Sequence, residues 1–271
     1  MRLMPLESWA DMLAPLAGTG RRLGYVRGEF GNVGDTLQER AAFEMFQAFD
    51  LDVTWLGPVP DASQPWAWDR ADGRWDGRVG DDIDELLLFG GGNMGVVGGS
   101  VHIRQKAVKT GLPITILPNS WRAAETVANC RRYYARESGS LQFRPDAVLM
   151  PDLGLGLEFD ESLRARAPWR DLGVFLRHDK EARFSGAVIS NQGAPFDQID
   201  KRDVDGYLML AASCRRIVTD ALHFAIAGLM CGREVHLAPG QYHKNRSMFA
   251  SWLQSLGCLW AEDPRDVEGV L

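Results

Sequence analysis

Short apolar runs rich in β-branched residues alternate with longer helical patterns along the whole chain of 271 residues. In the first half, the apolar runs predict strands at 22–27, 52–56, 85–89, 113–117, 132–136 and 146–150. Helical periodicity there predicts helices at 35–49 and near 100–109. The second half repeats the scheme, with strands at 172–177, 215–219, 234–238 and 258–262 and helices at 203–213, 221–231 and 244–256. Strands that alternate with helices form βαβ units, so the sequence predicts an α/β protein with parallel sheets.

The length fits two domains or one large one, because a domain typically contains ~100–200 residues, and the repeated scheme favours two. The periodicity is lost around 156–170, which we take as a linker between an N-terminal domain of residues 1–160 and a C-terminal domain of residues 161–271. Each domain is predicted to be Rossmann-like. Open parallel sheets bind ligands at the carboxyl ends of their strands. We therefore expect the functional site in loops that follow strands, with the two sheets facing a central cleft.

The chain is acidic, with 30 lysines and arginines against 36 aspartates and glutamates and a net charge of −6. This balance argues against nucleic acid as a partner, because nucleic-acid binders usually carry a basic excess. It still permits a locally positive site for a small anionic substrate.

The four cysteines form no CxxC pair and match no zinc-binding spacing, so we expect reduced core thiols and no metal site. Residues 1–18 lack the unbroken apolar core of a signal peptide. No stretch approaches the ~18 consecutive apolar residues of a transmembrane helix. Together these features predict a cytoplasmic protein.

The loop GEFGNVGDT at 28–36 joins the first predicted strand to the first predicted helix. Its glycines permit a tight turn, and Asn32 or Asp35 can cap the helix that follows. Free N–H groups at a helix N-terminus bind anions or sugar hydroxyls, so Asn32, Gly34 and Asp35 are candidate site residues. The alternative is a simple turn with a capping aspartate.

A second glycine-rich loop, GGGNMG at 90–95, also follows a predicted strand. It fits the GxGxxG pattern, but a dinucleotide site also needs an acidic residue about 20 positions further on, and the sequence there reads TILPN at 115–119. We therefore favour a glycine floor under a bound ligand, made by Gly91, Gly92 and Asn93. The absence of a GxxxxGK[ST] segment excludes a P-loop nucleotidase.

The segment TDALH at 219–223 separates a predicted strand from the most apolar helix of the chain. Asp220 and His223 thus stand at a strand-to-helix junction, which is where α/β sheets bind ligands. The alternative for a lone histidine is a structural position in the core.

Basic residues gather in QYHKNR at 241–246, at the start of a predicted helix. A helix N-terminus favours acidic residues, so cations there indicate an anionic ligand, with Tyr242, His243 and Lys244 among its contacts. The alternative is a solvent-exposed charged turn.

Taken together, these loops resemble the polysaccharide pyruvyl transferase family. The matching segments keep the family order between residues 23 and 262: GNVGDT at 31–36, LLLFGGGN at 86–93, PITILPNS at 113–120, ARES at 135–138, PD at 151–152, TDALH at 219–223 and YHKN at 242–245. Each segment is short, and their common order makes the resemblance fairly specific.

The resemblance implies a GT-B-like architecture of two Rossmann-like domains. It also implies an enzyme that moves the enolpyruvyl unit of phosphoenolpyruvate onto a sugar, with a pyruvate ketal and inorganic phosphate as products. By the same resemblance, Arg136 binds phosphoenolpyruvate, and His223 matches the histidine of the family's Arg-Leu-His segment.

One position departs from the family pattern. Ala221 stands where the Arg-Leu-His segment has its arginine, and alanine cannot provide a bidentate clamp on carboxylate or phosphate. Either the anionic donor has changed, or another cation takes over from the arginine, the candidates being Arg177, His178, Lys244 and Arg246.

We therefore predict a ketal pyruvyl transferase that acts on a hexose of a bacterial exopolysaccharide or surface glycan and needs no cofactor. His223 is then the general acid or the phosphate partner, and Asp35 is the base or a ligand of a sugar hydroxyl. Arg136 and Lys244 form the clamp for the anion. The acceptor is either free or lipid-linked, and the enzyme works in the cytoplasm or at the inner face of the membrane.

Two alternatives stay open. One is a GT-B glycosyltransferase that uses a nucleotide sugar. The other is a non-catalytic glycan-binding subunit of a polysaccharide assembly complex, which the replacement of the family arginine by Ala221 keeps open.

Trp66 and Trp68 lie in a long loop at about 57–82. A sugar has an apolar C–H face that suits an aromatic ring, so we predict that these two side chains form a platform for the acceptor. The alternative is that they pack, with Trp75, as a cluster on the domain surface.

Overall fold

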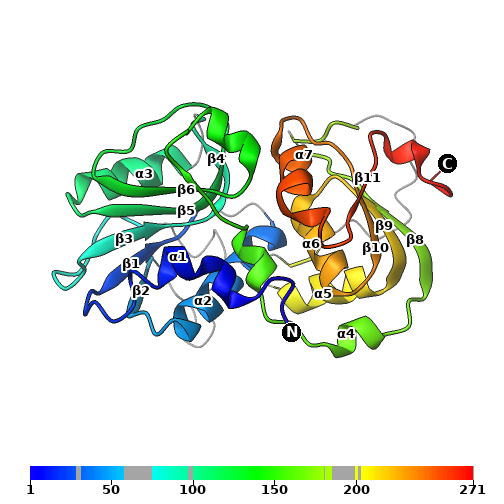
Figure 1. Ribbon diagram of the computed structural model, residues 1–271, viewed down its shortest axis with the longest axis horizontal. Coiled ribbons are helices and arrows are strands. Elements are labelled where there is room, and N and C mark those ends of the chain that lie inside the picture. The colour runs from blue at the N-terminus through cyan, green and yellow to red at the C-terminus, as the bar shows by residue number, and fades with distance from the viewer. Residues whose placement is uncertain are drawn as a thin grey trace. The chain divides into compact units, whose positions relative to one another are not determined.

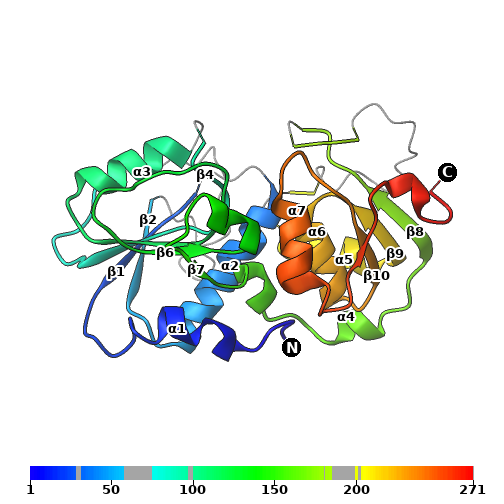
Figure 2. The ribbon, with the colours of Figure 1, turned by 45° about the horizontal axis from the view of Figure 1, so that its top comes forward.

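The computed structural model describes residues 1–28, 32–57, 75–96, 100–179, 181–184, 199–200 and 203–270. The chain forms two compact units, which Figures 1 and 2 show. The N-terminal unit consists of Met4–Gly31 and Gln38–Leu157, and the C-terminal unit consists of Met1–Leu3, Asn32–Leu37 and Glu158–Leu271. The C-terminal unit thus includes the start of the first long helix, which a contiguous division of the sequence does not anticipate.

The N-terminal unit is built on a seven-stranded sheet whose described strand pairs are all parallel. Its strands are β1 (Leu23–Val26), β2 (Val53–Leu56), β3 (Glu85–Leu88), β4 (Gly91–Met94), β5 (Ile114–Trp121), β6 (Cys130–Ala135) and β7 (Val148–Leu149). The order across the sheet is β2-β1-β3-β5-β6-β7, and β4 pairs with the later part of β5. Its shorter helical segments are η1 (Leu6–Trp9), α1 (Ala10–Leu13), η3 (Ser138–Gln142) and η4 (Leu153–Gly156).

The two long helices of this unit belong to connections that run toward opposite edges of the sheet. The helix α2 (Val33–Ala48) lies between β1 and β2 in the chain, and α3 (Ser100–Lys109) lies between β4 and β5. Because crossovers between parallel strands are right-handed, α2 and α3 fall on opposite faces of the sheet, as Figure 2 shows. The strand order reverses between β1 and β3, and the carboxyl ends of these strands form the switch point at which such sheets bind ligands.

The core of the N-terminal unit follows the predicted pattern. Leu37, Ala41 and Met45 of α2 recur at four-residue spacing and are fully buried, as an amphipathic helix requires. The strand β5 is buried at all eight positions, as expected of a central strand covered on both faces.

The C-terminal unit contains a four-stranded parallel sheet in the order β11-β10-β9-β8. Its elements are α4 (Ser162–Ala165), β8 (Arg170–Phe175), α5 (Val204–Ala212), β9 (Cys214–Thr219), α6 (Leu222–Met230), β10 (Glu234–Leu237), α7 (Lys244–Met248), the π-helical η6 (Phe249–Leu253), β11 (Leu259–Trp260) and η7 (Pro264–Asp266). Each strand pairs with the next, so every crossover steps in the same direction. Right-handed crossovers therefore place α5, α6 and α7 on one face of the sheet, as Figure 1 shows.

Among the described residues, Phe184 and the C-terminal segment pack on the opposite face of this sheet. Val267 and Val270 belong to one apolar cluster with Leu172, Val174 and Val218 of β8 and β9. The burial of this face therefore depends on residues close to the C-terminus.

An α/β fold with two parallel sheets is confirmed, and most predicted elements lie within a few residues of their expected positions. The strand β4 was not predicted, because a run of glycines has no alternation of side chains to read. Its backbone nevertheless pairs with β5, with Gly91 opposite Asn119. The helix predicted at 244–256 is a short α-helix that continues as a π-helical turn.

In the described ranges, no helix combines the length and apolarity needed to cross a membrane. The cysteines are unpaired, with Cys214, Cys231 and Cys258 buried and Cys130 partly buried. Burial raises the pKa of all four thiols, so they stay protonated at neutral pH. Three of them lie in the core, as expected from the sequence, whereas Cys130 does not.

Candidate active site

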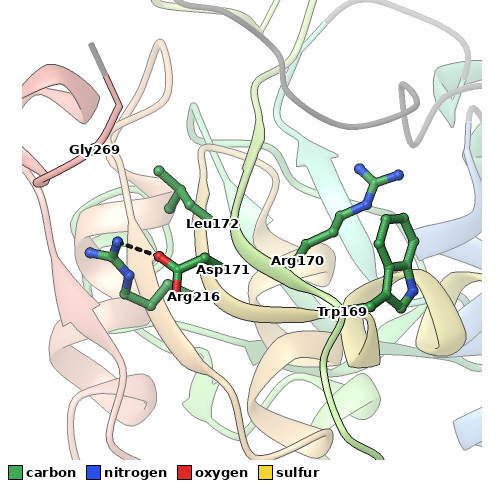
Figure 3. A pocket seen from close by; sticks show the side chains of 6 residues that line it. All are labelled: Trp169, Arg170, Asp171, Leu172, Arg216 and Gly269. Carbon is green, nitrogen blue, oxygen red and sulfur yellow. Dashed lines mark hydrogen bonds and ion pairs between the residues drawn. The ribbon is translucent and has the colours of Figure 1, made fainter.

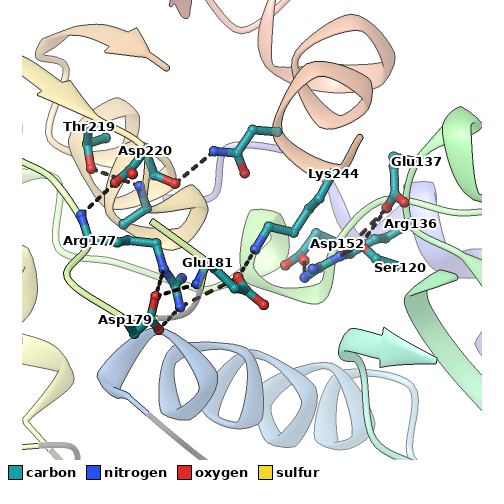
Figure 4. A network of polar contacts seen from close by, with 12 residues as sticks. Ser120, Arg136, Glu137, Asp152, Arg177, Asp179, Glu181, Thr219, Asp220 and Lys244 are labelled. Carbon is teal, nitrogen blue, oxygen red and sulfur yellow. Dashed lines mark hydrogen bonds and ion pairs between the residues drawn. The ribbon is translucent and has the colours of Figure 1, made fainter. Parts of the chain in front are cut away.

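The loops after β8, β9 and β10 meet at one edge of the C-terminal sheet, where Asp220, labelled in Figure 4, and Asn245 join them. The Oδ1 atom of Asp220 accepts a hydrogen bond from the backbone N–H of Arg177 at 2.7 Å. The Nδ2 atom of Asn245 donates to the carbonyl oxygens of Asp220, at 2.7 Å, and of Ala238, at 2.9 Å. Hydrogen bonds thus hold the three strand ends together at the edge where parallel sheets bind ligands.

Asp220 is the most deeply buried acid of this edge, with 1% of its surface exposed. Its Oδ2 atom is buried and accepts no hydrogen bond from the part of the chain that the structure describes. Burial raises the pKa of Asp220 from 3.8 to about 6, against the opposing hydrogen bond and charge of Arg177. A carboxyl group with such a pKa can exchange a proton near neutral pH.

A charged cluster of Arg177, Asp179, Glu181 and Lys244 lies in the same loops (Figure 4). The Nζ atom of Lys244 is 2.8 Å from Oε2 of Glu181, and only 9% of the lysine side chain is exposed. Arg177 donates from Nε to Oδ1 of Asp179 at 2.9 Å, and its guanidinium lies 3.5 Å from Glu181. Burial would raise the pKa of Glu181, but the charges of Lys244 and Arg177 outweigh it and lower that pKa. The cluster therefore holds two cations against two ionised carboxylates.

His223 stands in the first turn of α6. All the remaining residues of this helix are buried. Ala221 precedes the helix, and its backbone N–H donates to Oγ1 of Thr219 at 3.1 Å. Thr219 in turn donates to the carbonyl oxygen of Phe175 at 2.6 Å, which joins the ends of β8 and β9. The sequence segment TDALH therefore presents its histidine at the ligand edge while its threonine holds the turn.

The first turn of α2 belongs to the same unit and packs closely on His223. A Cβ atom built on Gly34 would lie 2.6 Å from Cβ and 2.7 Å from Nδ1 of His223. These distances are shorter than any ordinary carbon contact, so a side chain at position 34 would displace the histidine. Gly34 also donates from its backbone N–H to Oδ1 of Asn32 at 2.9 Å, which is the kind of contact predicted for a capping asparagine.

Asp35 follows Gly34 in this turn. Tyr207 of α5 interacts electrostatically with both Asp35 and Arg177 of the charged cluster. Burial raises the pKa of the Tyr207 phenol, the charge of Arg177 lowers it, and the charge of Asp35 raises it. Asp35 and Arg177 are thus both within electrostatic reach of one buried phenol. Tyr207 was not predicted as a site residue, because its position in an apolar helix gives no signal of this neighbourhood.

The loop after β10 contributes two aromatic rings. The rings of Tyr242 and His243 meet edge to face at 5.6 Å, and the Nζ atom of Lys244 lies 5.2 Å from the centre of the Tyr242 ring. Gln241 donates to the carbonyl oxygen of Ala182 at 2.6 Å, which ties this loop to the loop after β8. His178, after β8, is exposed.

Arg136 lies in the N-terminal unit, at the carboxyl end of β6, and is 1% exposed. Its guanidinium donates to Asp152 at 2.7 Å and to Ser120 at 2.8 Å (Figure 4). Glu137 approaches it at 3.7 Å. These contacts join the ends of β5, β6 and β7, and a donor could bind Arg136 only by exchange with these internal partners.

Gly91, Gly92 and Asn93 form most of β4, so the glycine floor predicted from the sequence is an extended strand next to the switch point. Trp66 and Trp68 lie outside the described residues. Trp75, from the same loop, is buried, and its Nε1 atom donates to the carbonyl oxygen of Arg78 at 2.7 Å. Trp75 is thus a packing residue, while the alternatives for Trp66 and Trp68 stay predictions.

Glu181 is the main residue of the site that the sequence did not reveal. The cations at 241–246 suggested an anionic ligand, whereas Lys244 has an internal carboxylate partner 63 residues away in the chain. No local pattern signals a pairing over that separation. Across the described ranges, no group of three or more His, Cys, Asp or Glu side chains is arranged to hold a metal ion.

Comparison with known proteins places these features in a family. The model of the family "Polysaccharide pyruvyl transferase" matches residues 32–237, whereas no curated protein matches the chain. A solved structure of an uncharacterised protein from Klebsiella pneumoniae has a TM-score of 0.69 at 17% identity, over 96% of this chain and 100% of that chain, and so shares the fold. A periplasmic sugar-binding protein from Pseudomonas fluorescens, with a TM-score of 0.27 at 11% identity over 80% of this chain and 68% of that chain, is too distant to inform the fold. Since the family match covers most of the chain, the protein belongs to the polysaccharide pyruvyl transferase family.

Proposed function

We propose that the protein transfers the enolpyruvyl unit of phosphoenolpyruvate to two hydroxyls of a hexose in a bacterial exopolysaccharide or surface glycan, where it forms a cyclic ketal. The observation that carries the proposal is the group of Arg177, Asp220, His223 and Lys244 at the carboxyl ends of β8, β9 and β10, in a chain of this family. The group combines cations for an anionic donor with a carboxyl and an imidazole group, the side-chain types that most often act in proton transfer.

Lys244 and Arg177 would bind the phosphate and carboxylate groups of the donor. They would thereby replace the arginine that the family has at the position of Ala221. Glu181 holds both cations in place without a donor, so it competes with the donor for them. The pairing with Glu181 stabilises the buried Lys244 and the partly buried Arg177 in the free protein, because a buried charge without a partner is costly.

His223 would act as the general acid. Its proton adds to the methylene carbon of phosphoenolpyruvate, which becomes a methyl group, and the neighbouring carbon becomes an oxocarbenium-like centre that a sugar hydroxyl attacks. Departure of phosphate regenerates such a centre, and the second hydroxyl closes the ketal. The two hydroxyl protons leave through a base, for which Asp35 is the proposed residue, and they restore the acid and protonate the phosphate. Lys244 and Arg177 would stabilise the charge of the departing phosphate.

The acceptor would be bound by the N-terminal unit, with Gly91, Gly92 and Asn93 under the sugar and Trp66 and Trp68 against its apolar face. In this proposal the two units adopt a GT-B-like arrangement, and Arg136 assists the donor by exchange with its internal partners. The acceptor would be free or lipid-linked, and the reaction would take place in the cytoplasm or at the inner face of the membrane.

Phosphate release tests the proposal directly. The protein is incubated with phosphoenolpyruvate and a panel of hexose glycans, and both free phosphate and glycan mass are measured. We expect one phosphate per ketal formed, and an increase in mass for only those glycans that are substrates. Release of phosphate without a change in any glycan would contradict a transferase.

The same assay separates the two alternatives. Turnover that requires a nucleotide sugar in place of phosphoenolpyruvate would identify a glycosyltransferase. Stable glycan binding without turnover of either donor would identify a non-catalytic subunit, which is the alternative that Ala221 keeps open.

A further inference from the structure

A pocket lies at the edge of the C-terminal sheet opposite the candidate active site (Figure 3). It has a volume of about 470 Å³, and its lining residues are Trp169, Arg170, Asp171, Leu172, Arg216 and Gly269. They come from the beginning of β8, the beginning of β9 and the C-terminal segment. The candidate catalytic residues follow the other ends of these strands, so the pocket is distinct from that site. Its volume falls in the range of small-molecule sites.

Trp169 gives the pocket an exposed apolar surface. It is 71% exposed, more than the other exposed large apolar side chains of the described chain. The guanidinium of Arg170 lies over its ring, 4.2 Å from the ring centre, and Figure 3 shows the two side chains together on one side of β8. A guanidinium stacked on an indole is attracted by the ring and is held in a defined place.

The other side of the pocket carries an anchored arginine. Arg216 donates to Oδ2 of Asp171 at 3.0 Å and to the carbonyl oxygen of Glu268 at 3.1 Å. Arg215, next to the pocket, donates to Oδ1 of the same aspartate at 2.7 Å. Two guanidiniums thus share one carboxylate, and that of Arg170 adds a third positive charge at the pocket, in a chain whose net charge is −6. Such a local positive excess favours an anionic ligand.

We propose that this pocket binds a sugar residue that bears a carboxylate. The apolar face of the sugar ring packs on Trp169, and the carboxylate binds Arg170 and Arg216, since guanidinium groups match carboxylates in geometry and charge. A small anion such as phosphate has no apolar face to cover the tryptophan. The pocket would hold an acidic residue of a glycan, whether a uronic acid or a pyruvate ketal, and this binding requires no turnover at the other edge of the sheet.

Titration calorimetry with defined sugars tests the proposal. The ligands are methyl glucuronide, a methyl galactoside with a pyruvate ketal, and neutral methyl glucoside, and the first two distinguish the sources of the carboxylate. We expect the wild-type protein to bind at least one acidic sugar and not the neutral one. Trp169→Ala and Arg170→Gln should each weaken binding about tenfold, through loss of the ring platform and of one charge-assisted contact.

Two further variants sharpen the test. Asp171→Asn removes the carboxylate that competes with the ligand for the guanidiniums, so the acidic sugar should bind more tightly. Arg265→Gln is the matched control, because it removes a surface arginine whose partner, Asp263, is not among the lining residues, and it should leave binding unchanged.

Several outcomes would overturn the proposal. Equal binding of methyl glucoside, or unchanged affinity in both Trp169→Ala and Arg170→Gln, excludes an acidic-sugar site. Binding of inorganic phosphate that only Arg170→Gln weakens indicates a simple anion site. Binding to vesicles of anionic phospholipid without binding of any acidic sugar indicates a membrane surface. A protein that binds the acidic sugar but releases no phosphate from phosphoenolpyruvate supports the pocket and contradicts only the proposed transfer.

Discussion

The position of His223 depends on the absence of a side chain at Gly34. Gly34 has no Cβ, and a Cβ there would lie 2.6 Å from the Cβ of His223. The sequence suggests that this glycine-rich loop serves a ligand, and the structure adds a packing requirement for one of its glycines. At the scale of single residues, a glycine is thus needed to keep the histidine of the site in its orientation.

Replacing His223 by alanine should lower kcat of the proposed transfer by about 10²–10⁴-fold, the usual contribution of a general acid or base. The thermal unfolding temperature should change little, because His223 is only partly buried, whereas the other residues of α6 are buried. His236→Ala is the matched control, since His236 is partly buried on β10 and bonds Glu234 at 2.8 Å. Near-wild-type kcat for His223→Ala would make the histidine a packing residue.

Replacing Gly34 by alanine should reduce activity about as much as a loss of the histidine, because the new methyl group occupies the place of the imidazole. Overpacking of this kind also costs about 1–3 kcal/mol of stability. Gly240→Ala is the control, since its Cβ would meet nothing closer than Asn245 at 3.6 Å and should be tolerated. The measurements are kcat, the imidazole NMR shift of His223 and the free energy of unfolding. An unchanged imidazole signal in Gly34→Ala would contradict a positioning role.

At the scale of elements, the loops after β8, β9 and β10 behave as one structure. Asn245 bonds the ends of β9 and β10, and Asp220 bonds the end of β8. Lys244 and Glu181 add an ion pair across the same loops. A change in one loop should therefore alter donor binding through its neighbours.

Lys244→Gln should raise the KM for phosphoenolpyruvate by about 10–100-fold, since a hydrogen bond to a charged group contributes about 1.5–3 kcal/mol. Arg246→Gln removes a cation from the same helix, where it is exposed and paired with Glu262, and should have little effect. Glu181→Gln should lower this KM, because the competing carboxylate is lost. If Lys244→Gln and Arg246→Gln raised this KM equally, the lysine would act through long-range charge attraction and not through direct contact with the donor.

Asp220 should make stability depend on pH. Its pKa is about 6 in the folded protein and 3.8 without burial, so the folded protein binds this proton more tightly. The contribution to stability is therefore present at low pH and is lost as the pH rises through 6. Between about pH 4 and about pH 7, wild type should lose roughly 3 kcal/mol relative to Asp220→Asn, as denaturant titrations can measure. Parallel pH profiles of the two proteins would show that Asp220 titrates normally.

At the scale of the whole molecule, strand and helix positions were largely predictable, because periodicity is a local signal. The buried run of β5 and the apolar face of α2 appear in the structure where the sequence indicates them. The strand β4 escaped prediction, since Gly91 and Gly92 have no side chains to form a pattern. The inclusion of Asn32–Leu37 in the C-terminal unit also escaped it, because tertiary contacts assign this turn.

The site was predictable only as a set of loops. Parallel strands bring their carboxyl ends to one edge, which identifies the neighbourhood of Asp220, His223 and Lys244. The partners within that edge depend on contacts between distant parts of the chain. Glu181 and Tyr207 therefore emerge from the structure alone.

The C-terminal segment should be essential for the stability of its unit. Val267→Asp would place a charge in the apolar cluster that covers β8 and β9, and we expect a loss of at least about 2–4 kcal/mol. Glu268→Gln is the control, because this neighbouring side chain is exposed and should have almost no effect. Denaturant unfolding of both variants provides the measurement, and equal stability would contradict the packing role of the segment.

The packing of Val267 and Val270 on the C-terminal sheet also affects how long the protein persists in a cell. Among the described residues, helices cover one face of the C-terminal sheet, whereas Val267 and Val270, together with Phe184, pack on the other. A loss of this packing would expose Leu172, Val174 and Val218 while the strand order stayed intact. Chaperones and proteases act on exposed apolar surface of this kind, and marginal losses of stability change abundance several-fold. The lifetime of the protein, and hence the amount of glycan it could modify, would then depend on packing that lies away from the candidate active site.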